Sequence, residues 1–142
     1  EALKPFKVGP WAVLPFDVAH DAEEPLGFLI INGADRLLFA ADTAYIRHRF
    51  AGLTHICLEC NYSKRTMAED IPLAHKLRVM RSHMGLDTVL GFLAANDLRG
   101  VRAIHLLHLS DDNSDETLFK NRVQAATGIP VYVAKRESIC TR

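Results

Sequence analysis

The spacing of apolar residues changes along this chain, and this change restricts its fold more than any other feature. Short apolar runs of strand length come first, at 11–20, 27–33, 36–42 and 54–60, with turn-forming residues between them. Apolar residues then recur at helical spacing at 72–82 and 86–96, before strand-like runs at 101–109 and 131–134 enclose a further helix. This order predicts an α/β layered domain with a mostly β first half.

Turn and capping residues mark where several of these elements begin and end. The letters NGAD at 32–35 join two strand-like runs, which predicts a β-hairpin. Pro15 favours a sheet edge or a bulge, because proline has no N–H to offer a neighbouring strand. Ser114 is predicted to cap the last helix, and Gly128 is predicted to end it.

Composition narrows the class of protein. A length of 142 residues, of which 49% are hydrophobic, suits a single domain with a buried core. The 17 basic residues balance the 17 acidic ones, so any contact with nucleic acid must be local. No apolar run approaches the ~20 residues of a membrane span, and the start EALKPFKVGP lacks the apolar segment of a signal peptide. We therefore expect no binding to membranes. Because three cysteines do not suggest a disulfide framework, we also expect a cytoplasmic protein.

Polar side chains that can bind metals stand where four of the predicted strands end. They are His20 and Asp21, Asp42 and Thr43, Glu59 and Asn61, and His108 and Ser110. Ligands of open α/β sheets tend to bind outside the carboxyl ends of the strands, where side chains leave a rigid scaffold. A lone strand-end histidine is more often a hydrogen-bonded surface residue. The shared placement therefore predicts a metal site, which no single residue would.

Two pairs of residues three positions apart need a separate interpretation. His105 and His108 face opposite sides of a regular strand, so only His108, nearer the end, is a ligand candidate, and His105 is predicted to be packed. Cys57 and Cys60 spell C-x-x-C, a pattern of zinc and redox sites. The strand also separates these two thiols, and we interpret both as small buried residues.

The segment VLPFDVAHDAEEPLGFLIINGADRLLFAADTAY resembles the middle of the metallo-β-lactamase superfamily. In that superfamily a ligand histidine precedes a Gly-aromatic strand, and a metal-bridging aspartate follows in an Asp-Thr turn. The resemblance implies that His20 is a ligand of the first metal and that Asp42 bridges two metals. It extends over residues 11–134, nearly the whole chain.

Three later segments resemble the nuclease-type branch, which includes ribonuclease Z-like and exonuclease-like hydrolases. They are HICLECNYSKRTM with an acidic strand end, SHMGLDTVLGFL with a histidine that opens a helix, and HLLHLSDDN with a histidine that binds the second metal. This resemblance implies that His108 is a metal ligand and that His83, oriented by Glu59, acts beside the scissile group. The alternative for His83 is a residue that only flanks the start of a helix.

Further site residues follow from the same resemblance. Asn61, Ser110 and Asn113 are assigned to substrate binding. The alternative for Asn113 is a solvated loop with the two aspartates before it. The superfamily's first signature, His-x-His-x-Asp-His, is absent, because no two of the seven histidines lie two residues apart.

The resemblance therefore implies that residues 1–142 form the carboxyl-terminal half of a four-layered αββα sandwich, a mixed sheet with helices on one face. The amino-terminal half, or a second copy of the chain, would cover the other face, and the chain alone is expected to be inactive.

The implied activity is hydrolysis of phosphodiester bonds, in nucleic acid or a small diester, by a dinuclear centre. Two divalent ions, zinc or manganese, would lower the pKa of a bridging water and stabilise charge on the attacked centre. A lactam or thioester hydrolase would share His20, Asp42 and His108 but would not require the Glu59 and His83 segments. A non-catalytic assembly module, which the missing signature favours, would need no metal.

Overall fold

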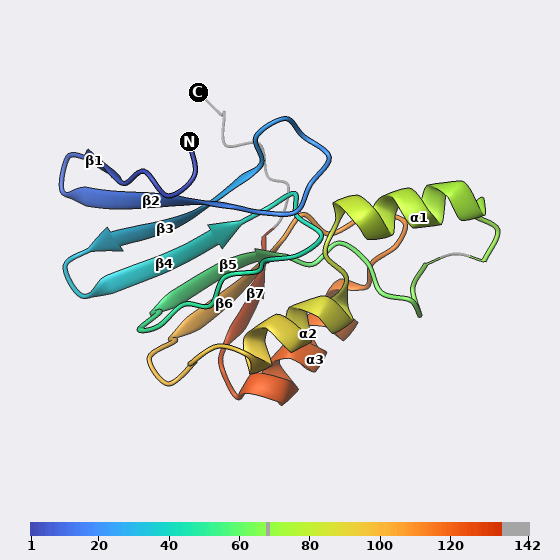
Figure 1. Ribbon diagram of the computed structural model, residues 1–142. Helices are drawn as coiled ribbons and strands as arrows, with labels where there is room; N and C mark the ends of the chain where they lie inside the picture. The colour runs from blue at the N-terminus through green and yellow to red at the C-terminus, as the bar shows by residue number, and fades with distance from the viewer. Residues whose placement is uncertain (68, 135–142) are drawn as a thin grey trace, which may run out of the picture.

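The computed structural model describes residues 1–67 and 69–134, and within them seven strands form one sheet in chain order (Figure 1). The strands are β1 (Phe6–Val8), β2 (Trp11–Asp17), β3 (Leu26–Asn32), β4 (Asp35–Ala40), β5 (His55–Glu59), β6 (Ala103–Leu107) and β7 (Val131–Val133). Strands β1 to β4 pair antiparallel, and β4 to β7 pair parallel. The predicted mixed sheet is therefore confirmed.

The predicted hairpin is present between β3 and β4. Asn32 pairs with Asp35, and Gly33 between them takes a positive φ of 58°, a conformation that glycine adopts without steric cost. The prediction for Pro15 also holds, because β1 pairs with β2 only from Trp11 to Val13. Beyond Val13, β2 has no strand partner on that side, so the missing N–H of Pro15 interrupts no pairing with β1.

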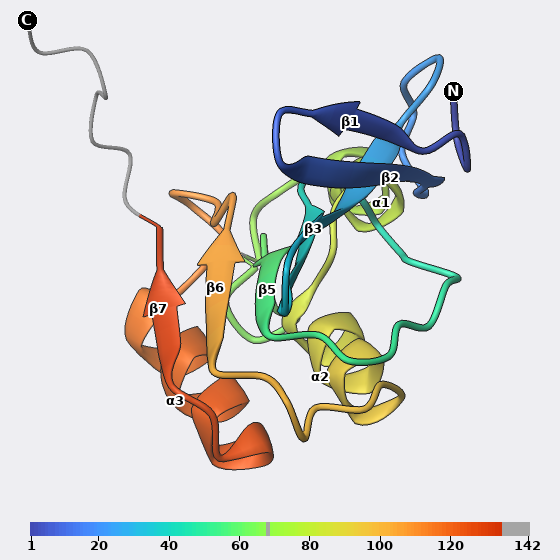
Figure 2. The same cartoon turned by 90° about the vertical axis from the view of Figure 1, so that its left-hand side faces the viewer.

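The helices of the described chain are α1 (Leu73–Ser82), α2 (Leu86–Ala94) and α3 (Glu116–Thr127). α2 and α3 lie side by side against the β5 to β7 part of the sheet (Figures 1 and 2). The core joins strand residues such as Ile56, Leu58 and Ile104 to Val89 of α2 and Phe119 of α3, all fully buried. None of the helices in this part of the chain has the length and apolar composition needed to cross a membrane.

The opposite face of the sheet is apolar and exposed. Phe6 lies across from Val13, Val8 from Trp11, and the row Phe39, Cys57, His105 and Tyr132 crosses β4 to β7. Since paired residues share a face and residues two apart do too, these side chains all lie on the side away from the core. We call it the open face. Its large apolar residues Phe6, Val8, Trp11, Phe39 and Tyr132 are between 37% and 59% exposed.

Several predicted boundaries were wrong. Asp115, and not Ser114, caps α3: its Oδ1 accepts a hydrogen bond of 2.8 Å from the backbone N–H of Leu118. Ser114 instead donates from Oγ to the carbonyl of Ser110, at 2.6 Å. β2 ends at Asp17 rather than at residue 20, and the short strand β1 was not predicted. Its three residues stand between Pro5 and Gly9, too few for an apolar period.

Candidate metal centre

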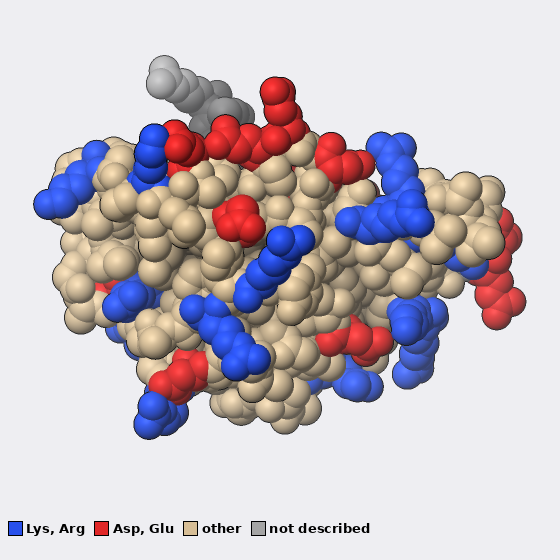
Figure 3. Space-filling view, in the orientation of Figure 1, with Lys and Arg blue, Asp and Glu red and all other residues tan. Residues whose placement is uncertain are grey.

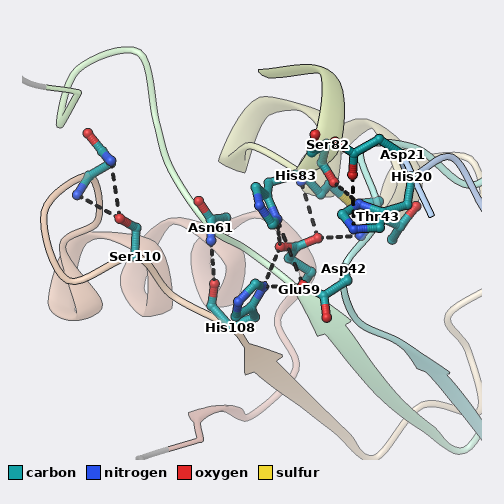
Figure 4. Close-up of polar contacts among 12 residues, drawn as sticks. His20, Asp21, Asp42, Thr43, Glu59, Asn61, Ser82, His83, His108 and Ser110 are labelled. Carbon is teal, nitrogen blue, oxygen red and sulfur yellow. Dashed lines mark hydrogen bonds and ion pairs between the residues drawn. The ribbon is translucent and has the colours of Figure 1, made fainter. Parts of the chain in front are cut away.

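Three neighbouring parallel strands bring the candidate residues to one edge of the sheet. Glu59 is the last residue of β5, while Asp42 and His108 follow β4 and β6 by one or two residues. His83 enters from the end of α1, as Figure 4 shows. Because β4, β5 and β6 are adjacent and parallel, their carboxyl ends meet there. Asp42, Glu59, His83 and His108 each offer a ligand atom, and these four atoms lie within 4.8 Å of one another.

Asp42 and His108 both take a left-handed backbone conformation, with φ of 49° and 52°. This conformation costs a residue with a side chain roughly 1–2 kcal/mol, so it persists only where the surroundings enforce it. At both positions the chain turns sharply as it leaves its strand, which aims the side chain at the strand ends. Two of the three non-glycine residues with this conformation in the described chain lie in the cluster, which favours a candidate functional site there.

The Glu59 carboxylate joins the cluster together. Its side chain is fully buried. Oε1 accepts hydrogen bonds from Nδ1 of His83 at 2.7 Å and from Nδ1 of His108 at 2.8 Å. Oε2 accepts from the backbone N–H of Thr43 at 2.6 Å and of Met84 at 3.4 Å. Since these four donors occupy both oxygens, Glu59 orients its neighbours and has little capacity left to bind a metal itself.

These contacts determine which imidazole nitrogens are free. A carboxylate accepts only, so Nδ1 of His83 and of His108 must carry the proton, and their Nε2 lone pairs remain. His20 shows the same arrangement, because its Nδ1 donates to the carbonyl of Ser82 at 2.9 Å. An imidazole that donates from one nitrogen to a carboxylate or carbonyl and presents the other is typical of metal-binding histidines.

Asp42 completes the donor set. Its side chain is 57% exposed, and its Oδ1 lies 2.9 Å from Nδ1 of His108 and 4.0 Å from Nδ1 of His83. Nitrogen and carboxylate donors beside solvent suit zinc or manganese. The residues present therefore fit a divalent ion, which Asp42 and His108 would hold, while Glu59 fixes the imidazoles of His108 and His83.

His20 lies next to this cluster but is not one of its four residues. Its ring centroid is 5.7 Å from that of His83, and its Nε2 is 3.3 Å from Oδ1 of Asp21. The structure thus brings together Asp42, His108, Glu59 and His83. His20 lies beside His83, on the side of α1 (Figure 4).

The three residues assigned to substrate binding lie along the chain around His108. Asn61 is 7% exposed and donates from Nδ2 to the carbonyl of His108 at 2.8 Å. Asn113 is 6% exposed, and its backbone N–H and Nδ2 both donate to Oγ of Ser110, at 3.1 and 3.2 Å. These contacts hold the loop that carries His108. A direct contact of Asn61, Ser110 or Asn113 with substrate stays a prediction.

Sequence reasoning missed the groups that hold Glu59. The backbone N–H of Thr43 and of Met84 carry no signal in the residue type, and the carbonyl of Ser82 that binds His20 carries none either. The position of Thr43 directly after the candidate ligand Asp42 was the one available hint, since its hydroxyl donates to the carbonyl of Tyr45 at 3.0 Å and fixes this turn.

His105 and the two cysteines of the C-x-x-C pattern behave largely as predicted. His105 lies on the open face, where it stacks on Tyr132 with ring centroids 5.2 Å apart, and it is not part of the metal cluster. Cys60 is buried and Cys57 half-buried, and both are free thiols. Burial raises the pKa of both thiols, which keeps them protonated and poor as metal ligands or nucleophiles.

Comparison with known proteins identifies the fold. No family model matches the sequence, and no curated protein matches it. Among solved structures, the metallo-β-lactamase fold protein YhfI from Bacillus subtilis superposes with a TM-score of 0.70 at 15% identity, over 97% of this chain and 52% of that one. The chain has the fold of about half of a metallo-β-lactamase fold protein.

Two further structures agree with this assignment. Igni18, a metallo hydrolase from Ignicoccus hospitalis, gives a TM-score of 0.63 at 15% identity, over 97% of this chain and 57% of that one. Zn²⁺-bound PqqB from Methylobacterium extorquens gives 0.61 at 16% identity, over 94% and 51%. The chain thus spans about half the length of each of these three structures. That it is the carboxyl-terminal half stays a prediction.

Proposed function

We propose that this chain carries part of the active site of a metal-dependent hydrolase that cleaves phosphodiester bonds. The observation that carries the proposal is the buried Glu59 carboxylate, which holds the imidazoles of His83 and His108 at 2.7 and 2.8 Å beside the exposed Asp42. An assembly module would have no need of this arrangement, because a buried carboxylate costs stability unless every contact is satisfied.

A divalent ion bound at Asp42 and His108 would polarise the attacked centre and generate a nucleophile from water at neutral pH. The remaining chemistry belongs to the residues themselves. His83 is 23% exposed, so its Nε2 can reach a substrate in the solvent-facing part of the site. When Nε2 takes up a proton, the Glu59 carboxylate at Nδ1 balances the imidazolium charge, and His83 can then donate to a phosphate oxygen or to the leaving oxygen.

The pair of Glu59 and His83 favours a phosphodiester over the alternatives. A lactam or thioester hydrolase of this superfamily would share Asp42 and His108 but would not require the segments around Glu59 and His83. A phosphodiester leaving group is an alkoxide, which a paired histidine can protonate. The sequence resemblance of the segments around Glu59, His83 and His108 to nuclease-type hydrolases supports the same choice, and the substrate is then nucleic acid or a small diester.

Replacement of His83 by Ala in the full-length natural protein is expected to lower cleavage of a single-stranded oligonucleotide, whose leaving oxygen is an alkoxide, by about 100-fold or more, the usual contribution of a general acid. Bound zinc and manganese, measured by elemental analysis, should stay nearly unchanged, because Asp42 and His108 still bind. His105→Asn, on the open face, is the control and should leave both quantities unchanged.

Two results would contradict these roles. Loss of bound metal in His83→Ala would make His83 a ligand instead of a proton donor. Turnover of a chromogenic lactam or thioester in place of the diester by the unaltered protein would reject phosphodiester cleavage while leaving the metal centre intact.

A further inference from the structure

A groove of about 810 Å³ runs between α1 and the residues that follow β2, beside the metal centre. Arg47, Arg78 and Arg81 line it, together with His20 and Asp21. Asp21 is the one acidic residue among the described side chains of this lining, so the groove carries an excess of positive charge. The metal chemistry described above assigns no role to these three arginines.

The arginines are arranged on two walls. Arg78 and Arg81 belong to α1, whose sequence LAHKLRVMRS contains three basic residues and no acidic one. Three positions apart on a helix, their side chains are neighbours on one side. Arg47 comes from the segment between β4 and β5. In Figure 3, Lys and Arg side chains lie over the α1 end of the molecule, with acidic side chains at its tip.

None of these three guanidinium groups forms an ion pair within 4.0 Å in the described part of the chain, and only Arg47 lies near enough to a carboxylate, that of Asp17, to help lower its pKa. The ion pairs found there involve Arg99 and Arg102 among the arginines, and both lie before β6 rather than near α1. Three like charges around one groove repel each other unless an anion or water lies between them. Guanidinium groups left in this state suit a phosphate, whose oxygens accept the paired N–H donors of the fork.

The groove leads to the metal centre. A smaller hollow of about 280 Å³ shares His20, Asp21, Arg78 and Ser82 with the groove and reaches His83. A ligand that fills both spaces therefore runs from the arginines to the imidazole held by Glu59. Val18 and Leu77 add apolar surface to the wall of the groove.

We propose that this arginine groove binds the phosphate backbone of an oligonucleotide next to the phosphodiester that the metal centre cleaves. The volume of 810 Å³ is far larger than a phosphate needs, since a water molecule occupies about 30 Å³ of the liquid, and leaves room for a sugar and a base. The placement of the scissile bond rests on the proposed function. The affinity of the groove for nucleic acid does not.

Binding of a short fluorescein-labelled single-stranded DNA to the metal-free chain, followed by fluorescence anisotropy in EDTA, tests the groove. The double variant Arg78→Ala/Arg81→Ala should raise Kd at least tenfold. The slope of log Kd against log salt should fall by about 0.7 for each phosphate of the single strand that the variant no longer neutralises. Lys120→Ala/Arg122→Ala on α3, which removes the same charge from an exposed helix, is the matched control and should leave Kd nearly unchanged.

Equal weakening by both double variants would overturn the proposal, because it would reflect net charge alone. An unchanged Kd in Arg78→Ala/Arg81→Ala would overturn it as well. Since the measurement excludes metal and turnover, its outcome is separable from the proposed function. DNA binding that depends on the two arginines in a protein without diesterase activity would reject the hydrolase and keep the groove.

Discussion

Replacement of Glu59 by Gln is expected to weaken zinc binding by roughly 10–100-fold, the usual effect of losing the group that orients a ligand histidine. The change keeps the shape of the side chain but replaces one acceptor oxygen by an NH₂ donor. Each carboxylate oxygen of Glu59 accepts two N–H groups, so the amide NH₂ faces two donors in either orientation. If the NH₂ group points toward the histidines, it forces one imidazole to move its proton from Nδ1 to Nε2. In His108, Nε2 is the atom that would bind metal.

The same substitution should lower the stability of the metal-free protein. If the NH₂ group turns toward the backbone instead, the N–H groups of Thr43 and Met84 lose their acceptor inside the protein, at about 1–3 kcal/mol for each unsatisfied group. Urea unfolding in EDTA measures this loss, and titration against a chromogenic chelator measures zinc affinity. Glu23→Gln, in the exposed loop after β2, is the control. Unchanged zinc affinity together with an unchanged unfolding midpoint would show that Glu59 does not organise the centre.

The sequence was informative about where the site lies. Asp42, Glu59 and His108 follow apolar runs of strand length, and neighbouring parallel strands place their carboxyl ends together. Only local spacing and the order of elements were needed to predict this edge. The same pattern selected His20, although its strand ends three residues earlier, at Asp17. The resemblance to a known superfamily added His83, which lies at a helix end and has no periodic signal of its own.

The sequence was less informative about contacts between distant segments. Glu59 reaches backbone groups 16 and 25 residues away, and backbone donors look alike at every position of a sequence. The boundary error at α3 has a similar origin. Ser114 and Asp115 are both good capping residues, and the contact of Ser114 with Ser110 decides between them. The arginine groove was missed because Arg47 and α1 approach each other only in the folded chain.

The 142-residue chain on its own is expected to self-associate through the open face. Phe6, Val8, Trp11, Phe39 and Tyr132 expose large apolar surfaces on one side of the sheet, and soluble monomers seldom keep continuous patches of this kind. The matched solved structures are about twice as long as this chain. We therefore propose that a second apolar layer from the same full-length protein covers this face, and that a second copy replaces it when that layer is absent.

Sedimentation velocity of the 142-residue chain over a range of concentrations tests this expectation. Phe39→Lys/Tyr132→Lys should shift the chain to monomer, because lysine places a charge where the two apolar surfaces would meet, and it should cost little stability since the two residues are already 37% and 52% exposed. Met80→Lys on α1, at a residue 40% exposed, alters a similar apolar surface away from the sheet and should leave association unchanged. A chain that stays monomeric at every concentration, with no binding of a dye for apolar surface, would mean that the open face is stable in water and needs no second layer.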